Sequence, residues 1–348
     1  MNRSRPLRSP SRDMRRIATL TRWMRWSGPA SPARTISRAG APSWKNGSRI
    51  SPEADTGGTR PPDGGGTPMA GRSLKDRIGV DLGRRLPLED GIRWATEHGV
   101  RVIDAQTDIA PNALETFDDA RCAGVRELLE ASGIDFGLHT LSGVNVAEIS
   151  PFCRDAVDSY MKAYIDLAPK VGAKWIVVHG GYHFTACKTI RMNASIDRLK
   201  RIGDYAAERG VLLLLENLNW EPVLAEVNYM PVTPTECMHF FREIDNPAVR
   251  WSFTANHAHF LPGVGIDKFV DAMDFSLCHE VRLADNNGSY EIHQKPGEGT
   301  IDFGAMFRKI EGIGYTGHYT NGFGSIDDML AGRDYMVDRA REAGVKVD

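Results

Sequence analysis

Cysteine is scarce in this chain, and the few cysteines form no paired motif. Cys122, Cys153, Cys187, Cys237 and Cys278 are spread over 348 residues without a CxxC pair. This spacing excludes a disulfide framework and a zinc ribbon. We therefore expect a reducing compartment, the cytoplasm.

A dominant charge and a membrane-like composition are absent as well. The chain has 43 basic and 45 acidic residues, and 41% of its residues are hydrophobic. These values are typical of an ordinary soluble globular protein. The composition excludes a membrane-embedded or collagenous protein, and we expect no membrane partner.

The near-zero net charge hides an uneven distribution along the chain. Residues 1–68 hold 13 basic and 4 acidic residues, which leaves 30 and 41 for residues 69–348, a formal charge of −11. The first segment also holds 9 of the 19 prolines and a Gly-Gly-Gly run. It lacks the apolar periodicity needed to offset chain entropy, so we predict a disordered Arg/Pro/Gly-rich extension over 1–68 and one domain over 69–348.

The role of the extension stays open between several interpretations. We expect no secretory signal, because polar residues interrupt the apolar stretch at residues 17–26. An arm that binds nucleic acid and a transit peptide both fit the arginine-rich, acid-poor start. The remaining interpretation is that translation begins at Met69.

From residue 77 onward, short apolar runs alternate with helical patterns, which is typical of βα units around a parallel sheet. The sequence predicts helices over 88–98, 113–132, 155–171, 190–209, 235–244, 303–313 and 327–343. It predicts strands over 78–82, 100–106, 134–141, 174–179, 211–216, 249–254, 280–284 and 316–320. Eight strands in this length, with no GxGxxG after the first, favour a (β/α)8 TIM barrel over a doubly wound sheet.

Metal-ligand side chains follow several of these strands. The active site of a TIM barrel lies at the carboxyl ends of its strands. Imidazoles and carboxylates that follow apolar runs need partners there, either a metal ion or one another. The residues that end the strands or follow them closely are His139, His179, Glu216, Asn256, His257, Arg282, Asp285, Glu291, His293 and Asn321.

Amide and aromatic side chains near the same ends suit a polyhydroxylated ligand. Amides can bond to hydroxyl groups, and an indole ring can stack on the apolar face of a sugar. We therefore predict substrate contacts from Asn217, Asn219, Trp220, His183, Asn256 and Asn321.

Four motifs resemble the xylose-isomerase-like TIM-barrel superfamily, which contains sugar phosphate isomerases and epimerases and the endonuclease IV-like branch. They are VVHGG (177–181), LLLLENLN (212–219), NHAHF (256–260) and VRLADNNGSYEIHQKPGEGTIDF (281–303). The resemblance covers residues 77–340. It implies a divalent metal (Mn, Mg, Co or Zn) at the barrel mouth and proton transfer through an enediolate.

The resemblance also implies roles for individual residues. Glu216 matches a metal-binding glutamate that doubles as acid or base, and His257 matches the histidine of a DxxH motif. His139 and His179 match ligands of an additional metal in the endonuclease branch. The remaining matches are Glu291 and His293 to an acidic-x-His pair, and Asp285 to the aspartate that ends the seventh strand.

Three positions depart from the usual isomerase metal site. Thr254 replaces an aspartate, Arg282 replaces a histidine, and Asn321 or Gly322 replaces a glutamate. One remaining carboxylate would hold a hard cation weakly. We expect either a displaced metal, bound by His139, His179 and Glu216 or by His257, Glu291 and His293, or a metal-free pocket. In the metal-free case, Arg282 pairs with Glu216 or binds a substrate oxyanion.

The leading hypothesis is an isomerase or epimerase of a small sugar or keto acid. Glu216 is the first candidate base, and His257 or Asp285 is the second group, with Arg282 in a charge-stabilising role. The alternatives are a metal-dependent hydrolase or lyase of the endonuclease IV-like branch and a non-catalytic ligand-binding barrel. The charge of −11 disfavours nucleic acid as a partner, and a homo-oligomer stays open.

Overall fold

The computed structural model describes Met69 and residues 71–348. Parallel strands form a closed barrel of eight in the order β1-β10-β9-β8-β6-β4-β3-β2. The barrel strands are β1 (Ile78–Gly83), β2 (Val102–Ala105), β3 (Asp135–His139), β4 (Trp175–Val178), β6 (Leu212–Glu216), β8 (Val249–Thr254), β9 (Cys278–Leu283) and β10 (His318–Asn321). The predicted TIM barrel is confirmed, and no predicted strand end is displaced by more than two residues.

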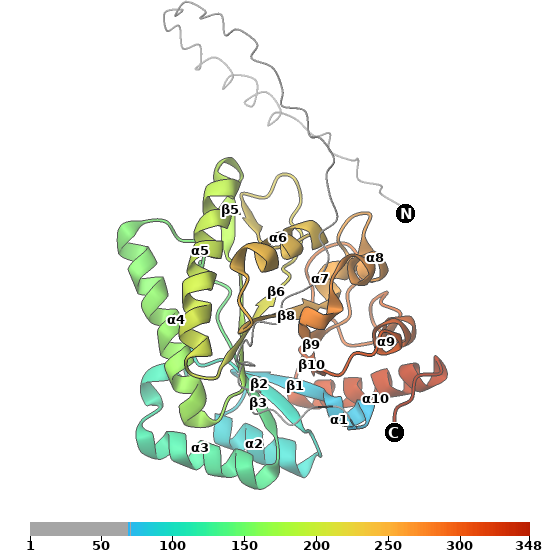
Figure 1. Cartoon of the computed structure of the whole chain (residues 1–348). Helices are drawn as coiled ribbons and strands as arrows, with labels where there is room; N and C mark the ends of the chain where they lie inside the picture. Colours follow the sequence, from blue (N-terminus) through green and yellow to red (C-terminus); the bar gives the residue numbers. More distant parts are fainter. Residues whose placement is uncertain (1–68, 70) are drawn as a thin grey trace, which may run out of the picture. The chain divides into compact units, whose positions relative to one another are not determined.

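Helices pack around the outside of the strands (Figure 1). The longer ones are α2 (Leu88–Glu97), α3 (Asp119–Ser132), α4 (Pro151–Val171), α5 (Lys188–Ala207), α6 (Pro234–Ile244), α8 (Gly265–Ala272), α9 (Phe303–Gly312) and α10 (Ile326–Glu342). The described part of the chain has no helix long and apolar enough to cross a membrane. The predicted disorder of 1–68 lies outside the described residues.

Local capping explains where several helices begin and end. The predicted helix over 113–132 is divided, because the Asp118 side chain caps α3 by accepting from the Arg121 N–H, and a short 3₁₀ turn precedes it. Gly133 and Gly172 end α3 and α4 in the left-handed conformation that glycine adopts most readily. Ser325 and Asp328 form a capping box at the start of α10.

Short elements near the strand ends were not predicted from the sequence. The helices α1 (Leu74–Arg77) and α7 (Ala255–His259) are each about one turn long, and α8 also escaped the prediction. Strands β5 (Tyr182–Phe184) and β7 (Val227–Tyr229) form a separate two-stranded antiparallel sheet. Because α7 and this sheet follow barrel strands directly, they shape the mouth of the barrel.

A small apolar cluster lies in the lower barrel interior. Val102 on β2, Trp175 and Val177 on β4, and Leu214 on the neighbouring strand β6 form their own buried cluster. Gly137 on β3 makes room for this packing, since an added Cβ would lie 2.0 Å from the Trp175 indole nitrogen. Above this layer, the barrel interior becomes polar toward the carboxyl ends of the strands.

Candidate metal centre at the barrel mouth

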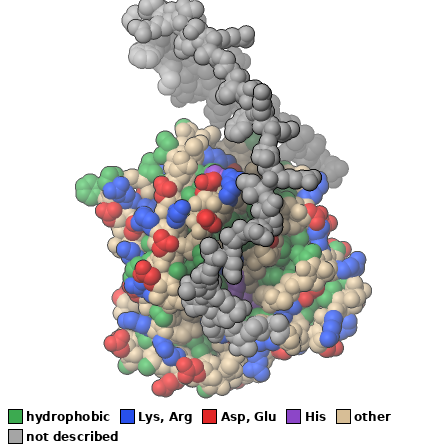
Figure 2. All heavy atoms as spheres, viewed as in Figure 1, with side chains coloured by type: hydrophobic (Ala, Val, Ile, Leu, Met, Phe, Trp, Pro, Cys, Tyr) green, Lys and Arg blue, Asp and Glu red, His purple; other side chains and the backbone are tan. Residues whose placement is uncertain are grey.

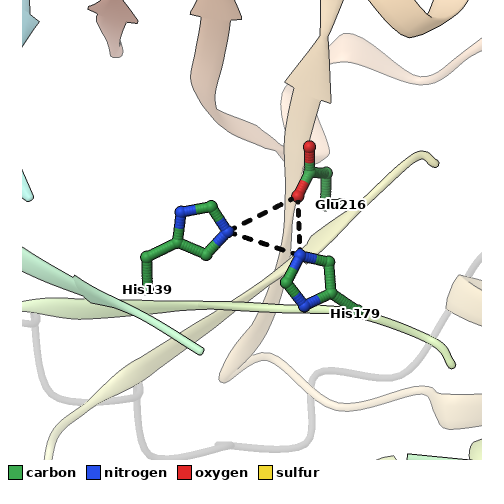
Figure 3. Close-up of side chains that lie close together, drawn as sticks. All are labelled: His139, His179 and Glu216. Atoms are coloured by element: carbon green, nitrogen blue, oxygen red, sulfur yellow. Dashed lines mark hydrogen bonds and ion pairs between the residues drawn. The ribbon is translucent and has the colours of Figure 1, made fainter. Parts of the chain in front are cut away.

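The first candidate ligand cluster joins three neighbouring strand ends. His139 ends β3, His179 follows β4, and Glu216 ends β6. Their side chains point toward one another (Figure 3). The His179 Nε2 lies 3.1 Å from Glu216 Oε2 and 3.3 Å from His139 Nε2, and the His139 Nε2 lies 3.8 Å from the same oxygen. Three ligand atoms thus face one point, as predicted for these residues.

A neighbouring hydroxyl orients the His179 imidazole, whereas His139 Nδ1 has no hydrogen-bond partner among the described residues. The Thr140 hydroxyl, which donates to the Val177 carbonyl, lies 3.4 Å from His179 Nδ1. A proton on Nδ1 leaves the Nε2 lone pair directed at the cluster, as in many metal-bound histidines. Burial, Arg282 and His179 lower the pKa of His139 to about 3, so this ring is a neutral donor at physiological pH.

Glu216 supplies the negative charge of this cluster. Burial opposes its ionisation, but the neighbouring imidazoles hold its pKa well below the usual range. The Thr254 hydroxyl donates to Glu216 Oε1 at 2.5 Å, whereas Oε2 faces the two histidines. The two carboxylate oxygens therefore have different partners, and only Oε2 is directed at the candidate metal position.

A second candidate cluster lies beside the first. His257 on α7 places Nε2 3.2 Å from Glu291 Oε1, and His293 Nε2 lies 2.7 Å from the same oxygen. Backbone carbonyls hold the opposite ring nitrogens: His257 Nδ1 donates to the Asn217 carbonyl at 2.8 Å, and His293 Nδ1 to the Gly322 carbonyl at 2.7 Å. Both Nε2 atoms are thus aimed at the cluster, again the arrangement of metal-bound imidazoles.

His257 differs from His139 in protonation. Both of its ring nitrogens face oxygen acceptors, which favours the imidazolium form. Burial works against the charge, but Glu291 and Glu216 outweigh it and raise the pKa of His257 to about 9. Despite its burial, Glu291 has a pKa lowered to about 2 by His257 and His293. The same pocket therefore contains a neutral imidazole, that of His139, and a cationic one, that of His257.

One cavity of about 310 Å³ connects the two clusters. The His257 Nδ1 lies 3.6 Å from Glu216 Oε1, so the clusters are in direct contact. Of the predicted substrate residues, only Asn219 lines this cavity. Other lining residues were not predicted, although Gln106 ends a predicted strand and Thr140 lies near the end of another: Gln106, Thr140, Ser142, Leu218, Glu221 and Tyr229.

Arg282 does not make the contact predicted for it. Its guanidinium donates to Asp104 at 2.6 Å, Asp81 at 2.9 Å and Glu280 at 3.1 Å, and no hydrogen bond or ion pair joins it to Glu216. The predicted pairing with Glu216 is therefore wrong. The reason is tertiary: β1, β2 and β9 each bring a carboxylate to this arginine inside the barrel.

Asp285 lies outside the cavity and is enclosed by the backbone. Its carboxylate accepts N–H groups from the loop that follows, at Asn286, Gly297, Gly299 and Ile301. The side chain is fully buried. This arrangement braces the loop that carries the second cluster and leaves no access to a substrate, so we correct the catalytic role predicted for Asp285.

The other predicted substrate residues have mainly structural partners. Asn217 donates to the Thr254 carbonyl and accepts from Trp251, and Asn321 donates to the Met329 carbonyl. Asn256 donates to Glu291 at 3.4 Å and so supports the second cluster. The remaining two, His183 on β5 and Trp220 after β6, do not line the cavity.

The end of β10 distinguishes the two residues that could align with the glutamate implied by the resemblance. Asn321 turns its side chain toward α10, whereas a Cβ at Gly322 would lie 3.4 Å from Asp81 and 3.8 Å from Arg282. Gly322 therefore faces the barrel interior. Thr254, Arg282 and Gly322 thus stand where the resemblance implies metal ligands, and neither an arginine nor a glycine side chain offers a lone pair to a cation.

The chain belongs to the xylose isomerase-like TIM barrel family, whose model matches residues 92–344. A fructoselysine 3-epimerase of Shigella flexneri is 21% identical over 68% of this chain and 85% of its own length. An uncharacterized protein of Methanocaldococcus jannaschii is 24% identical over 64% of this chain and 75% of its own. The crystal structure of a D-tagatose 3-epimerase-like protein superposes with a TM-score of 0.67 and 20% identity, over 77% of this chain and 98% of that one.

The chemistry of the donor atoms fits a divalent metal. Two imidazole nitrogens and one carboxylate oxygen form a tridentate set that leaves positions open for water or substrate. Zinc, manganese and cobalt accept such mixed nitrogen and oxygen ligands, whereas magnesium prefers oxygen alone. Each cluster has this composition, and the first is more buried than the second.

Proposed function

We propose that this protein is a metal-dependent isomerase or epimerase that moves a proton on a small sugar-like or keto substrate. The observation that carries the proposal is the convergence of His139, His179 and Glu216 at the mouth of the barrel. Family membership and the epimerase name of one relative support the same class of reaction. The ion would occupy this displaced position, because Arg282 and its carboxylates fill the interior next to it.

Different residues of the site would bind the ion and transfer the proton. A bound ion would polarise a substrate carbonyl and stabilise enediolate charge. Glu216 holds the ion position through Oε2. His257, an imidazolium at physiological pH, donates a proton or stabilises negative charge on a substrate oxygen. Glu291 Oε2, which is buried without a partner among the described residues, is available as a proton acceptor.

The second candidate function is metal-dependent hydrolysis or lyase action. It is favoured by the second cluster, because a carboxylate and two imidazoles beside the first set would suit a two-metal centre. Nucleic acid is a poor substrate candidate, since acidic residues outnumber basic ones in 69–348. On the face in Figure 2, acidic and basic side chains are interspersed, without a broad basic field.

Metal content and solvent-proton exchange test the proposal together. The full-length protein would be purified without chelators or metal-affinity resin and analysed by plasma mass spectrometry. Ketopentoses and ketohexoses would be incubated with it in D₂O and followed by NMR, because an enediolate route incorporates deuterium at the reacting carbon. The variants would be His139→Ala and Glu216→Ala, with His239→Ala on α6 as a control outside both clusters.

We expect at least one tightly bound ion per chain, together with deuterium incorporation. Both should be lost in His139→Ala and Glu216→Ala and kept in His239→Ala. Full activity of Glu216→Ala would refute its role as a metal ligand. Hydrolysis of a phosphodiester without deuterium incorporation would favour the second function, and ligand binding without any turnover would indicate a non-catalytic barrel.

A further inference from the structure

A second cavity of about 510 Å³ adjoins the metal-centre cavity at the barrel mouth. It lies between the loops that follow β1 and β2. Gln106 lines both cavities, so they share a wall at this residue. The remaining lining residues are Asp81, Gly83, Arg84, Arg85 and Ala110. The two cavities therefore lie side by side, with Gln106 between them.

Two arginines give the second cavity its chemistry. Arg85 is anchored, since its Nε donates to the Gly324 carbonyl at 2.8 Å and its Nη1 to the Asp81 carbonyl at 3.1 Å. Its Nη2 has no hydrogen-bond partner in the described part of the chain. Arg84 is exposed, and among the described residues it forms neither a hydrogen bond nor an ion pair. Both guanidinium groups thus offer free N–H donors to a ligand.

The glycine before these arginines allows the anchored conformation. Gly83 has a φ of 53°, in the left-handed region, and an added Cβ would lie 3.0 Å from Arg85 Nη1. A larger residue would push the guanidinium away from the loop backbone. The sequence Gly83-Arg84-Arg85 therefore places two cations at the edge of the cavity.

The carboxylate in this cavity does not neutralise the arginines. Asp81 Oδ2 accepts from Arg282 at 2.9 Å, so its charge is already compensated inside the barrel. Its Oδ1 is buried without a partner among the described residues and can accept a hydroxyl group. The cavity thus combines cationic donors with one acceptor, in a domain whose formal charge is negative.

We infer that the second cavity binds an anionic group of the substrate, a phosphate or a carboxylate, at Arg84 and Arg85. Guanidinium groups bind both oxyanions through charge-assisted, often bidentate hydrogen bonds. The reacting carbons lie at the metal centre, and a hydroxylated part of the same molecule passes Gln106 and Asp81. This assignment rests on the proposed function and narrows its substrate to acidic sugar derivatives longer than an unsubstituted ketose.

Binding and turnover would be measured on the full-length metal-loaded protein with four probes. The probes are inorganic phosphate, a ketohexose 6-phosphate, a hexuronate and the unsubstituted ketohexose. Equilibrium dialysis gives the dissociation constants, and NMR in D₂O gives turnover. Arg84→Gln removes one cation without breaking a contact. Arg101→Gln is the control, because Arg101 is exposed and lies at the opposite end of the barrel, before β2; it gives up one exposed hydrogen bond, to the Ser132 carbonyl at 3.2 Å.

We expect Arg84→Gln to weaken binding of the anionic sugar about tenfold or more and to leave the unsubstituted ketohexose unaffected. Arg101→Gln should behave like the wild type. Comparison of the sugar phosphate with the hexuronate decides which oxyanion is preferred. Equal affinity of wild type and Arg84→Gln for both anionic sugars would overturn the inference.

The inference and the proposed function fail in different ways. If unsubstituted ketoses are turned over, and a phosphate or carboxylate on the sugar improves neither binding nor turnover, the anion site is refuted and the proposed epimerase reaction is still supported. Phosphate binding that depends on Arg84, without deuterium incorporation into any sugar, would support the anion site and refute the proposed reaction. Thermal unfolding of each variant checks that the fold is retained.

Discussion

The buried ion network around Arg282 offers a sharp test of how this barrel is held together. Arg282 donates to Asp81, Asp104 and Glu280, and the last two are fully buried. The substitution Arg282→Met keeps much of the side-chain volume and removes the charge. The substitution leaves carboxylates in the barrel interior without their cation. Removing one partner of a buried ion pair destabilises a protein more than replacing both partners, because the remaining charge is buried without compensation.

The expected loss follows from these contacts. Removal of one partner of a buried pair costs about 3–5 kcal/mol, a large fraction of the roughly 5–15 kcal/mol by which domains are stable. The loss is not three times larger for three carboxylates, because Asp104 can take up a proton and become neutral. Burial raises the pKa of Asp104 well above the usual range, in spite of Arg282. We therefore expect a decrease of about 3–5 kcal/mol in the free energy of unfolding at pH 7.

The pH dependence distinguishes a charge effect from a packing effect. Burial opposes ionisation of Glu280, but Arg282 and His318 hold its pKa well below the usual range. A lowered folded-state pKa stabilises the wild type above the unfolded-state pKa, and this contribution is lost as the pH falls through the folded-state value. In Arg282→Met the pKa of Glu280 rises, so the stability difference should widen from about pH 4 to pH 7.

Urea unfolding followed by circular dichroism at several pH values measures this difference. The variant Arg282→Met/Glu280→Gln should recover part of the loss, because it no longer buries that charge. Arg101→Met serves as an exposed control and should change stability by less than about 0.5 kcal/mol. A loss below about 1 kcal/mol at pH 7, or a loss independent of pH, would refute the account of Arg282 as the stabilising cation.

Two further predictions concern the second cluster and the barrel glycines. Zinc binding at His257, Glu291 and His293 must displace a proton from His257, whose pKa is about 9. In the His139→Ala variant, which lacks a ligand of the first cluster, the zinc affinity of the second cluster should therefore rise about tenfold per pH unit between about pH 7 and pH 9. Calorimetric zinc titrations measure this affinity, and an affinity independent of pH would contradict the prediction. Gly79→Ala should destabilise the barrel severely, since its Cβ would lie 2.3 Å from the Val102 carbonyl oxygen, whereas Gly124→Ala in α3 meets no atom within 4 Å and should stabilise by about 0.5–1 kcal/mol. Thermal unfolding compares the two, and similar effects would contradict the packing argument.

Periodicity and strand ends made most of the barrel and part of the site predictable. Most barrel strands are short and mainly apolar runs between turn signals, with β10 as an exception, and a closed parallel barrel brings all carboxyl ends to one mouth. For this reason His139, His179 and Glu216 could be grouped although they lie far apart in the chain. The second cluster could be named from residues that follow β8 and β9, with the help of the family resemblance, although α7 itself was not predicted.

The short elements at the mouth were not predictable, because no periodicity marks them. A helix as short as α7 and a three-residue strand such as β5 give too few positions for a pattern. These elements decide which side chains line the cavity. Several expected substrate residues therefore turned out to bind the backbone, and lining residues such as Gln106 and Tyr229 were missed.

The sequence by itself determined the fold and the ligand types at the strand ends, because both follow from local pattern and from the geometry that every TIM barrel shares. Only the tertiary structure decided the partners of the charged residues. Arg282 binds carboxylates of three strands, and Asp285 is enclosed by the backbone amides of its own loop. Charge pairing depends on distances of a few ångströms between segments remote in sequence, and a linear pattern does not contain those distances.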